Sequence, residues 1–278
     1  MRARVEAAHS PAEPPVWGRN KLLAVMAGAL LAVVLLLAGL VLAVGYALTP
    51  QDSAAAAAST ATTRTSAGDG PAVRTDPRHD AVADEPMPTA GHRDALPGPL
   101  STRDPGVIEL PRATGTGPAD VPTGFPHTFE GALAQLAAID VTAMQTGSLA
   151  GVREVITGWA APGGPTSETW TGVLGMSRML SSAGLSGSGS PQLAVVVRPA
   201  MGLIKGTVGP DFAVVCVDFE FTVTLARTAR IAIADCQRMV WDDDRWIIGP
   251  GPEPAPAPSV WPGTDLAIEV GYQDLRYV

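Results

Sequence analysis

The sequence lacks every common catalytic or nucleotide-binding motif. It contains no HExxH, GxGxxG, P-loop or GxSxG pattern, and the segment Gly184 to Ser188 lacks the second glycine of the last of these. Histidine is scarce, and His127 is the only one beyond residue 120. A single histidine at a predicted helix start is more typical of a cap or surface residue than of a catalyst. We therefore predict no catalytic residue, no cofactor and no metal site, and a protein that is not an enzyme.

The sequence also has little positive charge. Its formal net charge is −8, and the Lys and Arg residues form no basic stripe. Proteins that bind nucleic acid through their charge need such a stripe to meet the phosphates. We therefore expect no direct nucleic-acid binding, and we expect no small-molecule partner.

The acidic residues do not follow the spacing of a common site. The adjacent carboxylates of Asp242 to Asp244 lack the alternating spacing of a calcium-binding EF-hand loop, and their place between Trp241 and Trp246 predicts a hairpin turn. Asp218 and Glu220 share one face of a predicted strand. They form either a pair of acids or part of a solvated face.

One long apolar run lies near the N-terminus. Residues 22–48 are almost wholly Leu, Val, Ala, Met and Gly, and no charge occurs from Leu22 to Gln51. About 20 apolar residues in a helix span a bilayer, whereas a cleaved signal peptide has an apolar core of about 7–15 residues. We predict a signal anchor, with cleavage near Ala54 to Ala58 as the alternative. Arg and Lys precede the run, which predicts a cytoplasmic tail at 1–21 and a cell-membrane protein with its C-terminal domain outside the cytoplasm.

Residues 49–120 are rich in Ala, Thr, Asp, Gly and Pro and poor in aromatic residues. Such a segment cannot bury enough apolar surface to offset its ordering entropy, so we predict a disordered linker. The one apolar island, Gly106 to Leu110, belongs either to this linker or to a short strand.

Residues 121–249 show helical patterns followed by strand patterns. Apolar residues recur at helical spacing after Thr128, again from Leu149 to Trp159, and again after Thr166 or Ser167. From Leu193 onward the runs are short and rich in β-branched residues. This order predicts an α+β domain in which N-terminal helices pack on one face of a curved antiparallel sheet. The predicted strands are 193–197, 202–208, 212–225, 230–241 and 245–248.

Cys216 and Cys236 are the only cysteines, and both lie in predicted strands. A hairpin centred on Ala226 aligns the apolar faces of the two strands and places Cys216 opposite Cys236. Either the two cysteines form a disulfide, or a shift of two residues keeps the faces and leaves two free thiols.

Residues 250–278 begin with a Pro-rich spacer and end in an apolar-aromatic segment that Thr264 can cap as a short helix. We predict a docking segment that packs either on its own domain or on a partner. The residues proposed for partner docking are Trp261, Leu266, Val270, Tyr272 and Leu275.

Three short segments carry a family resemblance: Gly124 to Thr128, Asp244 to Ile247, and Trp261 to Leu275. The chain resembles single-pass membrane proteins of conjugative elements in high-GC Gram-positive (actinobacterial) bacteria. Their outer domain is similar to the cystatin-like, nuclear-transport-factor-like cone of conjugation proteins related to TcpC and the VirB-type inner-membrane scaffolds.

The resemblance implies a non-enzymatic, membrane-anchored scaffold of a conjugation or type IV secretion-like apparatus. It would act through contacts with proteins of an envelope complex, or with further copies of itself. A second hypothesis is a cone that binds a small ligand or acts as an enzyme, with Asp218 or Asp235 as its acid. A third is an accessory protein of the cell envelope. Fold alone cannot decide between them.

Overall fold

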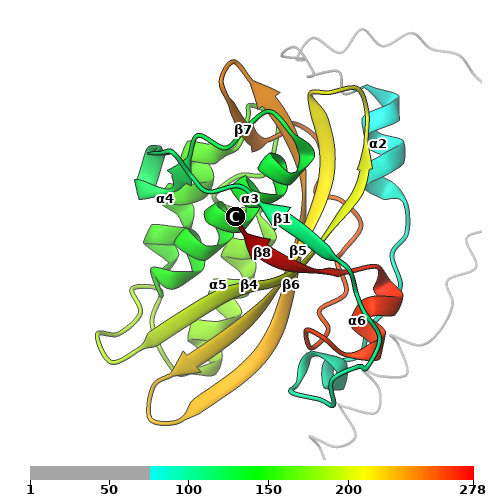
Figure 1. The fold of residues 1–278 in the computed structure, drawn as a ribbon. Helices are drawn as coiled ribbons and strands as arrows, with labels where there is room; N and C mark the ends of the chain where they lie inside the picture. The colour runs from blue at the N-terminus through cyan, green and yellow to red at the C-terminus, as the bar shows by residue number, and fades with distance from the viewer. Residues whose placement is uncertain (1–75) are drawn as a thin grey trace, which may run out of the picture. The chain divides into compact units, whose positions relative to one another are not determined.

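The computed structural model describes residues 76–278. The predicted cytoplasmic tail, the predicted membrane helix at 22–48 and the first part of the predicted linker lie outside these residues. The described residues build an α+β unit with a curled, six-stranded sheet whose strand order is β1-β8-β4-β5-β6-β7 (Figure 1). Helices cover one face of the sheet, and extended segments with short helices cover much of the other.

Four consecutive strands form the antiparallel centre of this sheet: β4 (Ala194–Thr207), β5 (Phe212–Thr224), β6 (Thr228–Asp242) and β7 (Arg245–Ile248). Beside β4, the C-terminal strand β8 (Gln273–Tyr277) pairs in parallel with β1 (Val107–Leu110). A separate hairpin joins β2 (Gly115–Thr116) to β3 (Pro122–Thr123), on either side of the short helix η2 (Pro118–Asp120).

Three helices pack on the concave face of the sheet: α3 (Phe129–Gln145), α4 (Leu149–Trp159) and α5 (Thr171–Ser182). The hydroxyls of Thr128 and Ser148 cap α3 and α4 by accepting backbone N–H bonds from Gly131 and Gly151. Helix α5 begins later than predicted, because the hydroxyls of Thr166 and Thr169 hold residues 166–170 in a local turn.

The opposite face of the sheet is covered by α2 (Pro77–Asp84), η1 (His92–Ala95), the Pro-rich segment after β7, and α6 (Asp265–Val270). For this reason β5 is buried on both faces, and Cys216 and Asp218 are as inaccessible as their apolar neighbours. The interpretation of Asp218 as part of a solvated face is therefore wrong.

The prediction of a disordered linker is wrong from residue 77 to residue 120, where helices and strands occur. This segment buries only a few apolar side chains, among them Ala83, Ala95 and Leu110, but each fills a gap on the sheet or helices. A composition argument misses such a segment, because its ordering entropy is offset by a surface that the rest of the domain supplies.

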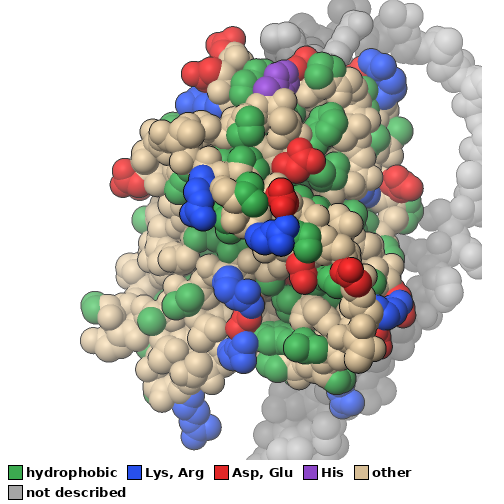
Figure 2. All heavy atoms as spheres, in the orientation of Figure 1, with side chains coloured by type: hydrophobic (Ala, Val, Ile, Leu, Met, Phe, Trp, Pro, Cys, Tyr) green, Lys and Arg blue, Asp and Glu red, His purple; other side chains and the backbone are tan. Residues whose placement is uncertain are grey.

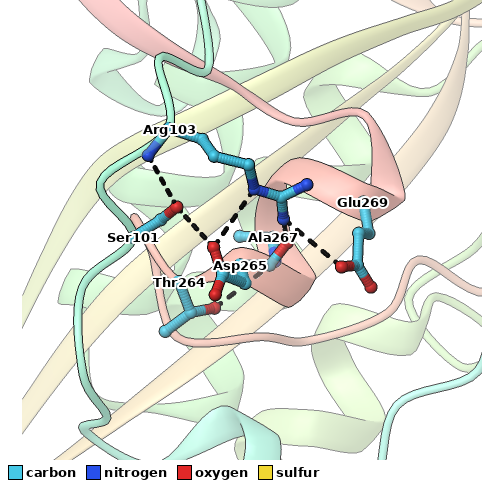
Figure 3. A network of polar contacts seen from close by, with 6 residues as sticks. All are labelled: Ser101, Arg103, Thr264, Asp265, Ala267 and Glu269. Carbon is cyan, nitrogen blue, oxygen red and sulfur yellow. Dashed lines mark hydrogen bonds and ion pairs between the residues drawn. The ribbon is translucent and has the colours of Figure 1, made fainter.

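The surface of the described residues carries both signs of charge. On the face shown in Figure 2, acidic and basic side chains are interspersed and no large patch of one sign forms. A network of hydrogen bonds and ion pairs joins Ser101 and Arg103, in the segment before β1, to α6 (Figure 3). Ser101 donates a hydrogen bond of 2.5 Å to Asp265, and the guanidinium of Arg103 contacts Asp265 at 3.2 Å and Glu269 at 3.3 Å.

The predicted fold class needs correction. No helix within residues 76–278 is both long enough and apolar enough to cross a membrane. The sheet is mixed instead of antiparallel throughout, because β1 and β8 run parallel at one edge. Neither β1 nor β8 was assigned to the sheet, since β1 lies in the predicted linker, where a short strand was the alternative, and β8 lies in the predicted docking segment.

Candidate ligand pocket

A pocket of about 410 Å³ lies between α5, the second half of α3, and strands β5 and β6. Its size falls within the range of about 300–1,000 Å³ that is usual for small-molecule sites. The odd-numbered residues of β5 and β6 point toward the helices and form one wall, while α5 presents Gly172 and Gly175. The apolar lining consists mainly of Met144, Met176, Met179, Phe219, Phe221, Val223, Ile231 and Ile233.

Two carboxyl groups interrupt this apolar lining, Asp140 from α3 and Asp235 from β6. Asp140 is only 3% exposed, and its Oδ2 atom has no hydrogen-bond partner. Asp235 accepts bonds of 3.0 and 3.2 Å from the side-chain amide of Gln237. The same amide donates to Glu253 at 2.9 Å, and Glu253 also accepts from the backbone N–H and the hydroxyl of Thr171. Elements far apart in the chain thus form one acidic cluster.

Burial changes the protonation of both pocket carboxyls. Loss of solvent raises the pKa of Asp140 well above its ordinary value, and the charges of Asp235 and Glu253 raise it further. Burial also raises the pKa of Asp235 to about 7, although its hydrogen bond from Gln237 opposes the shift. Both carboxyls therefore keep a proton to higher pH than an exposed aspartate does, and because their charges interact they titrate as a unit.

The structure brings the two cysteines together. Cys216 lies directly opposite Cys236 with their Cα atoms 4.0 Å apart, and a disulfide joins them. The predicted pairs of Phe219 with Ile233 and of Phe221 with Ile231 are also present. The disulfide lies on the face of the sheet away from the pocket, where the Met87 sulfur is 4.0 and 3.7 Å from the two cysteine sulfurs. It is part of the core and not of the pocket.

The apolar-aromatic C-terminal segment packs on its own domain. Trp261, Val270 and Tyr272 are buried, and the Tyr272 hydroxyl donates to the Pro258 carbonyl at 3.2 Å. Leu266 is half-buried against the core around the disulfide, and Leu275 is half-buried against the larger core beneath the helices. Of the two alternatives for this segment, the structure has the intramolecular one, and these five side chains do not form a free surface for a partner.

Asp218, the other acid considered from the sequence, is separated from the pocket by the sheet. It is fully buried on the face that carries the disulfide, and neither of its carboxylate oxygens has a hydrogen-bond partner. Burial raises its pKa well above the ordinary value. Of the two candidate acids, only Asp235 reaches the pocket.

The other residues considered from the sequence, His127 and the acidic turn at Asp242 to Asp244, have structural roles. The His127 ring stacks on Trp241 at 4.2 Å, and its Nε2 atom lies 2.9 Å from Asp211. Asp243 takes a left-handed backbone conformation in the tight turn between β6 and β7, and the rings of Trp241 and Trp246 meet edge to face beside it. Within residues 76–278 no three His, Cys, Asp or Glu side chains are arranged to bind a metal ion.

Sequence reasoning missed Asp140, Thr171 and Glu253, although the sequence carries a signal for the first. Asp140 stands between Ile139 and Val141 in a helix whose other positions are nearly all apolar or small. A helix that is apolar all round is buried, and an acid within it must then be buried too. Asp235 continues the inward-facing series of Ile231 and Ile233, which is the same kind of signal on a strand.

No protein-family model, no curated protein and no solved structure matches this chain. The resemblance to conjugation scaffolds accordingly stays a prediction, and a functional assignment depends on the chemistry of the pocket.

Proposed function

We propose that the described domain binds a small molecule with an apolar body and one cationic, hydrogen-bond-donating group. The observation that carries this proposal is the unpartnered Oδ2 atom of Asp140 in a pocket with otherwise apolar walls. A buried polar atom without a partner costs roughly 1–3 kcal/mol, more when it is charged. A donor on a ligand recovers that free energy, so the pocket favours a ligand that brings one.

The charge of the pocket selects the sign of the ligand. Desolvation disfavours the charged forms of Asp140 and Asp235 and raises both pKa values. A bound ammonium group supplies positive charge in place of a proton and allows both carboxyls to be ionised and paired. A carboxylate ligand would add a further negative charge beside Asp140, Asp235 and Glu253, which makes binding of an anion at the acidic end of the pocket unfavourable.

The pocket changes which of the original hypotheses is preferred. The sequence led us to expect no small-molecule partner, and the ligand-binding cone was the alternative that required an enclosed apolar pocket with an inward-facing acid. The pocket, which is partly open to solvent, provides the apolar lining and the acid, Asp235, of that alternative. The expectation that the protein is not an enzyme stays a prediction.

Titration of the protein with octylamine tests the proposal, with octanoate as the anionic probe of similar size. At pH 7 we expect saturable binding of octylamine by calorimetry and no binding of octanoate at the acidic end. Asp140→Asn and Asp235→Asn should each weaken octylamine binding about tenfold or more, because each removes part of the charge that an ammonium pairs with.

Glu154→Gln, an exposed acid on α4, is the matched control and should bind octylamine like the unaltered protein. Absence of saturable octylamine binding would overturn the proposal. The proposal would also be overturned if the Asp140→Asn and Asp235→Asn variants bound octylamine as tightly as the unaltered protein does.

The scaffold role is a second candidate, and one structural feature favours it. From Thr228 to Gln237, β6 pairs with β5 but has no strand partner on its outer side within the described residues. On this outer side the backbone N–H of Ala234 donates to the hydroxyl of Ser259 at 3.0 Å. An open strand edge can add a strand from another protein through backbone hydrogen bonds.

Partner capture tests this second candidate. Conjugation or secretion proteins should be recovered with the full protein and not with a chain that ends at residue 120. Recovery of the same proteins with both chains would contradict a scaffold role for the domain. The predicted location, a cell-membrane protein with the domain outside the cytoplasm, rests on residues 1–48 and stays a prediction.

A further inference from the structure

We propose that the ligand of this pocket is dipolar, and that Arg178 binds an anionic group at the opposite end from the acid pair. This inference rests on the proposed ligand-binding function and specifies its ligand. It requires three features: a cation at the edge of the pocket, a fixed separation from the acids, and no internal partner for that cation.

Arg178 is the only cationic residue among those that line the pocket, and the only charged residue of α5. Its side chain is exposed, and it makes no ion pair with any residue of the described part of the chain. Most other pocket-lining residues are apolar, so Arg178 and the acid pair are the only charged groups that a ligand can meet there.

The position of Arg178 on α5 sets its distance from the acids. Thr171, at the start of the helix, bonds to Glu253 beside Asp235, and Arg178 follows seven residues later. Seven residues make almost two full turns, so both side chains lie on one face of the helix, about 10 Å apart along its axis. Gly175 lies between them, and a Cβ atom there would meet no other atom within 4 Å.

These features define the ligand by its chemistry. It carries an ammonium group and a carboxylate about 10 Å apart, joined by an apolar chain that lies along α5. Two sources have this chemistry, an ω-amino acid with a long alkyl chain and an extended apolar peptide. At about 3.3–3.6 Å per residue, a peptide of roughly three residues spans the distance. A carboxylate matches the planar guanidinium in a bidentate arrangement.

Calorimetric titration of the protein with four probes tests the inference. We expect 8-aminooctanoate to bind about fivefold more tightly than octylamine, the order of an exposed ion pair. We expect 4-aminobutanoate, which is too short to reach both ends, to bind less tightly than either. The tripeptide Val-Ala-Val distinguishes the two sources, since a peptide ligand should bind more tightly than the alkyl chain because its backbone adds hydrogen bonds.

Arg178→Gln should remove the advantage of 8-aminooctanoate and leave the affinity for octylamine unchanged. Arg93→Gln, an exposed arginine on η1, is the matched control and should alter neither. Equal affinities of the unaltered protein for octylamine and 8-aminooctanoate would overturn the dipolar ligand while leaving the proposed function intact. No binding of any amine probe would overturn both.

Discussion

Asp140 and Asp235 both line the apolar pocket, Asp140 buried and Asp235 half-buried, and this placement makes the stability of the domain depend on pH. In the unfolded chain the Asp235 carboxyl ionises near its ordinary pKa of 3.8, whereas in the folded protein its pKa is about 7. Between these values the unfolded state binds fewer protons than the folded state. The free energy of unfolding should therefore fall as the pH rises from about 4 to about 7.

Asp235→Asn tests this origin of the pH dependence. Asparagine keeps the shape of the side chain and never ionises, so the variant should be more stable than the unaltered protein at pH 7. Its stability should also fall less between pH 4 and pH 7, with the remaining slope due to Asp140 and Asp218, whose pKa values are also raised. Urea unfolding at several pH values measures both effects, and an unchanged slope would contradict the assignment.

At Gly175, a small substitution should change the stability of the helix, whereas a large one should reduce the volume of the pocket. It lies in the interior of α5, and a side chain there meets open space. Gly175→Ala should raise the free energy of unfolding by about 0.5–1 kcal/mol, because alanine loses less backbone entropy in a helix. Gly175→Leu should retain the fold and weaken octylamine binding by occupying the pocket.

Thermal unfolding and calorimetric titration check the two results. The nearby Gly172 provides a contrast, because a Cβ atom there would lie 2.9 Å from Met144 and from the Trp170 ring. Gly172→Ala should therefore destabilise the protein. A Gly175→Leu variant that folds and binds octylamine normally would place the binding site elsewhere.

At the scale of elements, the disulfide joins the two central strands β5 and β6 across 20 positions of the sequence. Closing a loop of this size removes conformational freedom from the unfolded chain and stabilises a protein by about 3 kcal/mol. The double variant Cys216→Ala, Cys236→Ala should lose about that much in guanidinium unfolding. Dithiothreitol should destabilise the unaltered protein and leave the double variant unaffected. Equal sensitivity of the two proteins would show that the bond is not formed.

The β5–β6 hairpin could be predicted from the sequence because two independent patterns agree on its register. The apolar alternation sets which residues face the helices, and the cysteine pair selects one register among those that keep the faces. Strand β4 was predicted as two strands, 193–197 and 202–208, with a break that contains Pro199. In the structure, shifts of register beside Pro199 and Ile204 keep the pairing with β5, and a single long strand curls around the helices.

At the scale of the whole molecule, the pocket could be predicted only in part. Asp235 was considered because it lies on the inward face of its own strand, which is a local pattern. Asp140 and Thr171 come from two different helices, and Glu253 comes from a Pro-rich segment that was predicted to be a spacer. No local pattern brings these elements together, because their meeting depends on how the helices pack across the sheet.

The extent of the domain is the largest difference between the prediction and the structure, and it can be tested directly. The sequence placed the start of the domain at residue 121, whereas the structure has packed elements from residue 77. Arg238 on β6 depends on this earlier segment, because its guanidinium is 2% exposed and lies 2.7 Å from the Asp80 carboxylate. A fragment of residues 121–278 lacks Asp80 and leaves this charge without that partner.

We expect a fragment of residues 76–278 to unfold cooperatively and the fragment 121–278 to lose its cooperative transition. Loss of Asp80 removes an ion pair of Arg238, and loss of the buried Ile108 and Leu110 side chains costs about 1.5–3 kcal/mol for each. The sum is comparable with the total stability of many domains, about 5–15 kcal/mol. Circular dichroism and thermal unfolding of the two fragments measure the difference. Equal thermal unfolding midpoints of the two fragments would show that residues 76–120 are not needed for a stable domain, as their composition had indicated.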